Sequence, residues 1–234
     1  MKIEYVGKCL VVEEEGKKVL VIGDLHLGYE ESLRRDGVFV PGGLVEETLK
    51  DLEEIFTRVG RVDEIVVLGD IKHRFSGSGG DEKDEVWQVF RFLRERGKKI
   101  IVTRGNHDTI LPSLASFGVS VVDYYIVGGG CFFHGDRDFE VLHGKEIETW
   151  VMGHIHPAIM LREGAKEEKY KCFLEGMFKG RRVVIVPSFF GGNEGSDVRV
   201  EGVRVPWNFR FENFKVWVAG EGLEVLDFGV LGKI

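Results

Sequence analysis

Short apolar runs rich in β-branched residues recur along the chain, and each of them stops at a glycine or a polar residue. The runs are VLVI at 19–22, IVVL at 65–68, IIVT at 100–103, CFF at 131–133 and WVM at 150–152. Apolar runs of this length are typical of strands that are buried in a sheet. Burying them all requires a large sheet-based core, so this pattern constrains the fold more than any other feature.

Amphipathic helical segments separate the first strands. Residues 43–60 place apolar side chains on one helical face and stop at Gly60, and residues 84–97 repeat the pattern and stop at Gly97. Strands that alternate with helices predict an α/β fold with parallel strand pairing. The second half of the chain is richer in strands and glycine turns, which predicts a second packed sheet. With no internal repeat and no linker, we expect residues 1–234 to form a single domain.

Composition excludes several classes of protein. The net charge of −7 is unlike the broad basic face of a protein that coats duplex DNA. The three cysteines, Cys9, Cys131 and Cys172, are far apart, which predicts buried thiols in a reducing compartment rather than disulfides. The N-terminus lacks a signal-peptide pattern and no apolar run reaches the length of a membrane span. We therefore expect a soluble cytoplasmic protein with no membrane partner.

Residues suited to binding metal follow every one of the apolar runs. They are Asp24 and His26 after the first run, Asp70 and His73 after the second, Asn106, His107 and Asp108 after the third, His134 after the fourth, and His154 and His156 after the fifth. Each motif alone is ordinary turn chemistry. In open α/β sheets, however, the carboxyl ends of the strands form the ligand site, so the five motifs together predict one shared site.

The mixture of imidazole, carboxylate and amide groups indicates divalent metal ions. Imidazole suits Mn, Fe, Ni and Zn, whereas carboxylate and amide oxygens suit harder ions such as Mg. The set is too large for one tetrahedral zinc ion, which takes four ligands. It fits two ions that share a carboxylate, an arrangement that acidifies water and stabilises both the attacking and the leaving oxygen of a phosphoryl displacement.

The ordered motifs D-x-H, G-D, G-N-H-D, H and G-H-x-H resemble the signature of the calcineurin-like metallophosphoesterases. The resemblance implies an α/β fold, a four-layer αββα sandwich of two mixed sheets, with two metal ions at the strand ends. The first ion would take Asp24, His26, Asp70 and His156, and the second Asp70, Asn106, His134 and His154, with Asp70 bridging. We expect Mn, with Fe, Ni, Zn and Mg as alternatives. His107 matches the family's non-ligand histidine, which acts on the substrate.

Two further details narrow the resemblance. The stretch GDIKH at 69–73 places His73 where the protein-phosphatase branch has an aspartate, and it is similar to the exonuclease branch, in which this histidine contacts the substrate phosphate. We therefore expect a catalytic role for His73, with Arg74 as a candidate phosphate ligand. The stretch at 24–43 resembles the single-domain phosphoesterases encoded beside DNA ligases and helicases, and their archaeal relatives.

The roles of four other residues have two interpretations each. Arg34 and Arg35 are candidates for contact with a phosphate backbone, or are solvated side chains. Phe189 and Phe190 are candidates for stacking on a base, although packing in the core is the better reading.

Three functions remain open at this point. The leading hypothesis is a two-metal phosphoesterase that hydrolyses phosphodiesters, a nuclease acting on single-stranded DNA or RNA because the acidic chain disfavours long duplexes. The second is a phosphatase or pyrophosphohydrolase of small nucleotides. The third is a non-catalytic interaction module on the same fold. Loss of ligands or of the catalytic histidine would mark that third class, and this chain keeps His107 and all seven candidate ligands.

Overall fold

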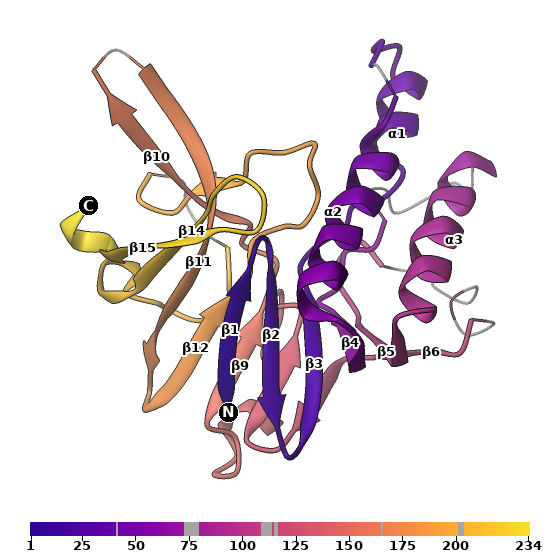
Figure 1. Cartoon of the computed structure of the whole chain (residues 1–234). Helices are drawn as coiled ribbons and strands as arrows, with labels where there is room; N and C mark the ends of the chain where they lie inside the picture. Colours follow the sequence, from indigo (N-terminus) through magenta and orange to yellow (C-terminus); the bar gives the residue numbers. More distant parts are fainter. Residues whose placement is uncertain (41, 73–79, 109–113, 115–116, 165, 201–203) are drawn as a thin grey trace.

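Two β-sheets lie face to face, and the α-helices gather on one side of them (Figure 1). This computed structural model describes residues 1–40, 42–72, 80–108, 114, 117–164, 166–200 and 204–234. Among these residues, no helix combines the length and the apolar character that crossing a bilayer requires.

The first sheet has six strands in the order β1-β2-β3-β4-β5-β6. They are β1 (Lys2–Val6), β2 (Cys9–Glu14), β3 (Lys17–Ile22), β4 (Val62–Val67), β5 (Gly97–Thr103) and β6 (Val119–Val122). The first three strands form an antiparallel meander, and β3 to β6 run parallel. The predicted parallel pairing is confirmed, and it brings the carboxyl ends of β3, β4 and β5 to one edge of the sheet.

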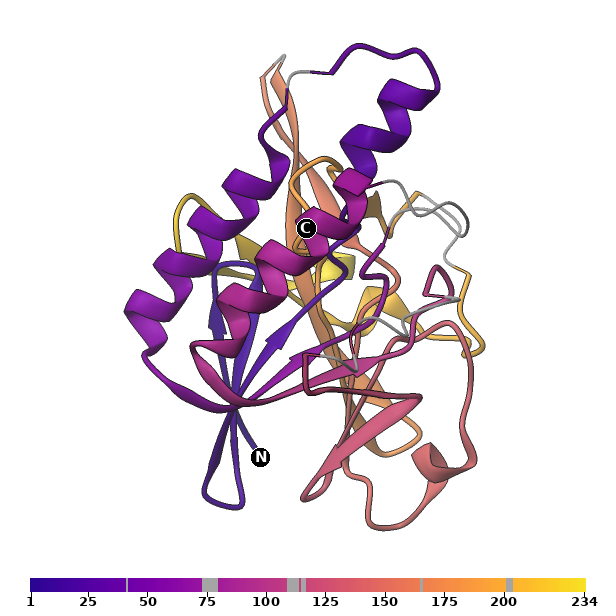
Figure 2. The same ribbon diagram turned by 90° about the vertical axis from the view of Figure 1, so that its right-hand side faces the viewer.

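Three helices are α1 (Tyr29–Arg35), α2 (Leu44–Val59) and α3 (Gly80–Arg94). Figure 2 shows α2 and α3 side by side over the first sheet. Helix α2 ends at the predicted Gly60. The predicted end of α3 is wrong, because Gly97 is the first residue of β5 and a Cβ there would lie 2.7 Å from Ile65 Cδ1. Gly97 therefore allows β5 to pack closely against Ile65 of β4. The sequence pattern did not predict α1.

The second sheet has nine strands, seven of them in the order β13-β10-β11-β12-β9-β8-β7, with β14 and β15 added beside β11. They are β7 (Tyr124–Val127), β8 (Gly130–Phe133), β9 (Thr149–Met152), β10 (Pro157–Glu163), β11 (Lys166–Phe178), β12 (Arg181–Ile185), β13 (Ser196–Asp197), β14 (Lys215–Ala219) and β15 (Val225–Val230). Strand β9 runs parallel to β8 and β12. The stretch 119–127 resembles one strand in sequence but divides at Asp123, with β6 in the first sheet and β7 in the second.

Alternation along the strands builds separate apolar layers. In β3, Val19 and Val21 face the second sheet, whereas Leu20 and Ile22 face the helices. The outer face of the second sheet is covered by three short 3-10 helices, η1 (Glu140–His143), η2 (Phe211–Asn213) and η3 (Leu231–Lys233), and by aromatic side chains such as Trp207 and Phe214. The predicted α/β fold with two mixed sheets is confirmed, and in the described residues 3-10 helices and loops form its fourth layer.

The three cysteines are free and buried, as predicted. Burial raises the pKa of the Cys131 thiol to about 12, so this sulfur stays protonated and packs as a small apolar group.

Candidate metal centre

The seven predicted metal ligands come together where β3, β4, β5, β8 and β9 end. Two groups form, one of Asp24, His26 and His156 and the other of Asp70, His134 and His154, and within each group the ligand atoms lie within 4.8 Å of one another. Asn106 joins the second group, since its Oδ1 lies 3.0 Å from His134 Nε2. The two sheets thus contribute to one cluster, as the strand-end pattern predicts.

Main-chain hydrogen bonds hold the strand-end loops against each other. The amides of Leu25 and His26 donate to the carbonyl oxygen of Asp70 at 3.1 and 2.9 Å, which ties the loop after β3 to the loop after β4. The amide of His107 donates to Asp70 Oδ1 at 2.9 Å, and the amide of His154 donates to Asp24 Oδ2 at 3.2 Å. The aspartates therefore position the neighbouring loops as well as offering ligand atoms.

Backbone strain concentrates at the candidate ligands. Positive φ angles occur at His26 (43°), Asp70 (45°), His154 (65°) and His156 (49°). This left-handed region costs free energy for any residue with a Cβ, and such conformations cluster at functional sites. The fold thus keeps these side chains in the cluster at a conformational cost.

Two positions beside the motifs require glycine because a carboxylate side chain lies very close to the backbone there. A Cβ on Gly105 would lie 2.2 Å from Asp70 Oδ1, and a Cβ on Gly153 would lie 2.7 Å from Asp24 Oδ2. Both contacts are far below van der Waals separation, so the carboxylates occupy the space that a larger residue would need.

The histidines of the second group bring two ring nitrogens close together. His134 Nδ1 donates to the carbonyl oxygen of Leu68 at 2.7 Å, and His154 Nε2 donates to that of Arg204 at 3.3 Å, because a carbonyl only accepts. The other ring nitrogens, His134 Nε2 and His154 Nδ1, lie 3.1 Å apart, and in neutral rings both would offer a lone pair to a cation. Burial lowers the pKa of His134, but Asp24 and Asp70 outweigh it and raise that pKa, so in the metal-free protein a proton on Nε2 takes the place of the cation and faces Asn106 Oδ1 at 3.0 Å. Ligands held ~2.1 Å from one ion at ~90–109° would be ~3.0–3.4 Å apart, so the spacing fits a shared cation.

The carboxylates also fit a cation. Asp24 Oδ1 is buried and has no hydrogen-bond partner among the described residues, although His156 Nε2 lies 3.3 Å from it. A buried carboxylate oxygen without compensation is costly, and a metal ion would supply that compensation. Burial would raise the pKa of Asp24, but the nearby His156, His134 and His26 outweigh it and hold the pKa below its usual range.

Asp70 lies within reach of both groups. Its Oδ2 is 3.5 Å from His134 Nε2 and 3.9 Å from His26 Nε2. Burial and, more weakly, the negative charge of Asp24 raise the pKa of this carboxyl to about 6 against the opposing attraction of His134. Two aspartates that both need a positive neighbour are therefore held in one small space.

Of the three residues predicted to act on the substrate, only His107 lies among the described residues. His107 belongs to neither ligand group, and its partly exposed ring has Nε2 4.0 Å from Asp70 Oδ2 and meets His26 edge-on. His73 and Arg74 lie outside the described residues.

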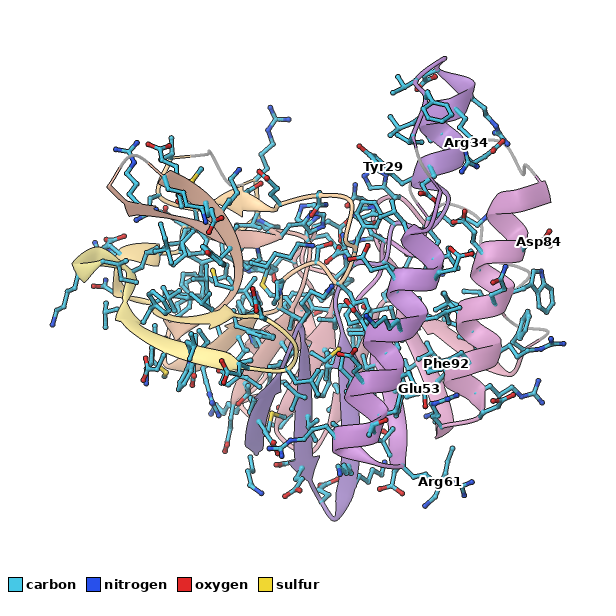
Figure 3. All side chains as sticks on the ribbon, turned by 45° about the horizontal axis from the view of Figure 1, so that its top comes forward. Tyr29, Arg34, Glu53, Arg61, Asp84 and Phe92 are labelled. Atoms are coloured by element: carbon cyan, nitrogen blue, oxygen red, sulfur yellow. The ribbon has the colours of Figure 1, made fainter. Side chains whose placement is uncertain are left out.

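The four residues with two interpretations each have described surroundings, and the contact of Arg34 and Arg35 with a substrate stays a prediction. Arg35 Nε lies 2.9 Å from a carboxylate oxygen of Glu31 on the same helix, and Arg34, visible on α1 in Figure 3, lies 3.9 Å from that carboxylate. Phe189 and Phe190 are buried, so both pack in the core as the better reading predicted.

Asp108 is a positioning residue whose role the sequence did not reveal. Its Oδ1 accepts the amide hydrogen of Ile71 at 2.9 Å, and its Oδ2 accepts that of Gly105 at 3.1 Å. The buried carboxylate thereby joins the loop after β4 to the loop after β5. Its place in the G-N-H-D motif was the only signal in the sequence.

Asn193 is a second residue that sequence reasoning missed. His156 Nε2 faces Asp24 Oδ1 and His26 Nε2, both at 3.3 Å, so binding a cation there leaves the ring proton on Nδ1. The Asn193 amide nitrogen lies 3.5 Å from that Nδ1, and its buried Oδ1 has no partner among the described residues. Turning the amide by half a rotation places the oxygen where it accepts the Nδ1 proton.

The sequence profile of the calcineurin-like phosphoesterases matches residues 17–220. This match extends over most of the chain and includes every strand-end motif. The chain belongs to the calcineurin-like phosphoesterase family. No curated protein sequence matches it at a significant level.

Several solved structures are similar to the chain. The nuclease MPE from Pseudomonas putida is 19% identical, with 93% of this chain and 100% of that chain covered and a TM-score of 0.61. The phosphoesterase YfcE from E. coli is 12% identical, with 89% and 91% covered and a TM-score of 0.41. Wild-type Vps29 from Entamoeba histolytica, complexed with zinc, is 16% identical, with 90% and 99% covered and a TM-score of 0.39. The similarity to MPE shows a shared fold.

We expect Asp70→Asn to weaken metal binding yet stabilise the metal-free protein. The pKa of Asp70 is raised to about 6 in the folded state, so its ionisation costs stability as pH rises through 6, and asparagine removes that cost at pH 8. Asparagine also tolerates the positive φ and keeps an acceptor for the His107 amide. Metal titration and thermal unfolding of the metal-free protein at pH 8 measure the two effects. Asp138→Asn, remote from the centre, is the control, and a lower melting temperature for Asp70→Asn contradicts the expectation.

We expect Asn193→Ala to weaken the first ion site selectively. Loss of an outer-shell partner of a ligating histidine typically lowers metal affinity about 10–100-fold. Titration of the metal-free protein with Mn²⁺ should show one weakened site and one unchanged site, whereas exposed Asn208→Ala should leave both unchanged. Equal affinity in wild type and Asn193→Ala would show that Asn193 does not hold His156.

Proposed function

We propose that the chain is a two-metal phosphodiesterase that cleaves single-stranded DNA or RNA, or the ends of strands. The observation that carries the proposal is the pair of ligand groups beside Asp70, with two imidazole nitrogens of the second group 3.1 Å apart. Membership in the phosphoesterase family and the shared fold of a nuclease support it.

Each ligand group would hold one ion. Asp24, His26 and His156 would hold the first ion and His134, His154 and Asn106 the second, and Asp70 would serve both. The mixed nitrogen and oxygen donors favour Mn, with Fe, Ni, Zn and Mg as alternatives. Such a pair of ions supplies positive charge to the phosphoryl oxygens and acidifies water.

The protein's own groups orient the substrate and handle its protons. His107 is held by its main-chain bond to Asp70 Oδ1, and we assign protonation of the leaving oxygen to its partly exposed ring. We assign His73 and Arg74 to the substrate phosphate from their sequence positions. A second imidazole helps a diester without adding a carboxylate that would repel it.

The negative net charge of the chain favours single strands and strand ends over long duplexes as substrates. A chain with a net charge of −7 binds long duplexes weakly, so strands or strand ends that reach the metal centre are the better substrates. Three buried free thiols agree with action in the reducing cytoplasm.

We expect His107→Asn to keep both ions while kcat falls about 10²–10⁴-fold, because the imidazole serves the reaction and not the ions. Metal content and kcat of the reconstituted protein measure this. His143→Asn is the matched control, since His143 pairs with Asp138 in the exposed segment around η1. Loss of metal, or an unchanged kcat, would show that His107 has another role.

We expect bis-p-nitrophenyl phosphate to be cleaved faster than p-nitrophenyl phosphate with Mn²⁺, and His73→Asp to narrow or invert this ratio. The reason is the second imidazole, which suits a singly charged diester. The measurement is kcat/KM for both esters, a panel of small nucleotides, and labelled single- and double-stranded DNA and RNA.

Other outcomes of that comparison identify the alternatives. A preference for monoesters with every polynucleotide intact would indicate a phosphatase or pyrophosphohydrolase of small nucleotides. Full occupancy by metal with no hydrolysis of any substrate would indicate a non-catalytic interaction module.

A further inference from the structure

Lys171, on β11, is a largely buried cation that has no ion-pair partner among the described residues. Its Nζ donates to the carbonyl oxygen of Ser188 at 3.0 Å and to that of Phe190. Carbonyl dipoles offset only part of the cost of burying a charge, and buried ammonium groups are normally paired with an anion. Burial, followed by repulsion from Lys8, lowers the pKa of Lys171 to about 7.

The exposed part of Lys171 faces a cavity of about 490 Å³. The cavity lies between the β1–β2 turn, α2, β11 and the β14–β15 turn, and Figure 1 shows the last of these near the ends of β1 and β2. Four lysines line it, Lys8, Lys50, Lys169 and Lys171, against two acidic residues, Asp51 and Glu54. The lining thus carries a formal excess of two positive charges in a chain whose net charge is −7.

Lys8 stands close to Lys171 in this cavity. Its Nζ lies 2.7 Å from Asp51 Oδ2 and 4.7 Å from the centre of the Phe189 ring. Asp51 contacts Lys8 directly, whereas Asp24, Glu47 and Asp51 act on the second ammonium group, Lys171, only from a distance. A bound anion would compensate the second.

We propose that this cavity binds a phosphate-bearing anion, with Lys171 at its floor and Lys8 beside it. An ammonium group is a common point-charge ligand for phosphate. A volume of about 490 Å³ holds a phosphate group with a small organic substituent, and it is of the size of ordinary ligand pockets. Lys50 on the rim attracts the anion from solution, whereas the Nζ of Lys169 donates to the carbonyl oxygen of Gly195 at 3.2 Å.

The cavity and the metal centre share one segment of chain. Ser188 and Phe190, whose carbonyls bind Lys171, also donate to the main-chain oxygen of Asp24, through Ser188 Oγ at 3.2 Å and the Phe190 amide at 3.2 Å. An anion that holds Lys171 in its charged form strengthens the support behind Asp24. The binding inference itself does not depend on the proposed activity.

The test is isothermal titration of the metal-loaded protein with inorganic phosphate and with sulfate. We expect Lys171→Met and Lys8→Met each to lower the affinity of one site about tenfold or more, which corresponds to about 1.4 kcal/mol. The matched control, exposed Lys145→Met, removes the same charge elsewhere and should leave the affinity unchanged. In Asp70→Asn, anion binding at the metal centre is weakened and the cavity site should persist.

Two results would overturn the proposal. Binding in Lys8→Met and Lys171→Met equal to that in Lys145→Met would show that the anion does not use the cavity. Loss of all binding in Asp70→Asn would place the anion at the metal centre alone. If Lys171→Met does not fold, Lys8→Met decides the question, because Lys8 is closer to the surface and its loss leaves the Ser188 and Phe190 carbonyls in place.

Discussion

Two imidazole nitrogens held 3.1 Å apart among buried carboxylates define this protein more than any single residue does. Two lone pairs at that distance repel each other, so the arrangement requires a positive charge between the nitrogens, either a proton or a metal ion. Neither ring can turn away, because His134 is fixed by the Leu68 carbonyl and His154 by the Arg204 carbonyl. Leu68 follows β4 in the first sheet, whereas Arg204 lies between β13 and β14 of the second sheet. The arrangement therefore requires the two sheets to pack against each other as they do.

The rest of the centre meets the same requirement at a conformational cost. Four candidate ligands adopt left-handed backbone angles, and Gly105 and Gly153 leave room for the aspartates to approach. Asp24 and Asp70 are buried close together, so each needs a positive neighbour. A cation would relieve the repulsion between the carboxylates and between the imidazole nitrogens, and its binding would offset the cost of the strained backbone. That agreement separates a metal centre from a chance cluster of polar residues.

Support for the centre extends outward in layers of hydrogen bonds. Asp108 joins two strand-end loops, and Ser188 and Phe190 hold the main chain of Asp24. Behind them, Lys171 binds the carbonyls of the same segment and faces the lysine-lined cavity. The candidate metal centre and the cavity are therefore connected directly, through the main-chain groups of Asp24, Ser188 and Phe190.

The sequence by itself determined β3, β4 and β5, their parallel pairing and the set of side chains at the strand ends. Strand periodicity and turn residues are local properties, and parallel strands necessarily bring their carboxyl ends to one edge. Only the tertiary structure decided that Gly97 opens a strand, that Asp123 divides two sheets, and that Asn193 and Lys171 stand beside and behind the centre. These features depend on contacts between residues far apart in the chain, such as Gly97 with Ile65, and no pattern within one segment encodes such a contact.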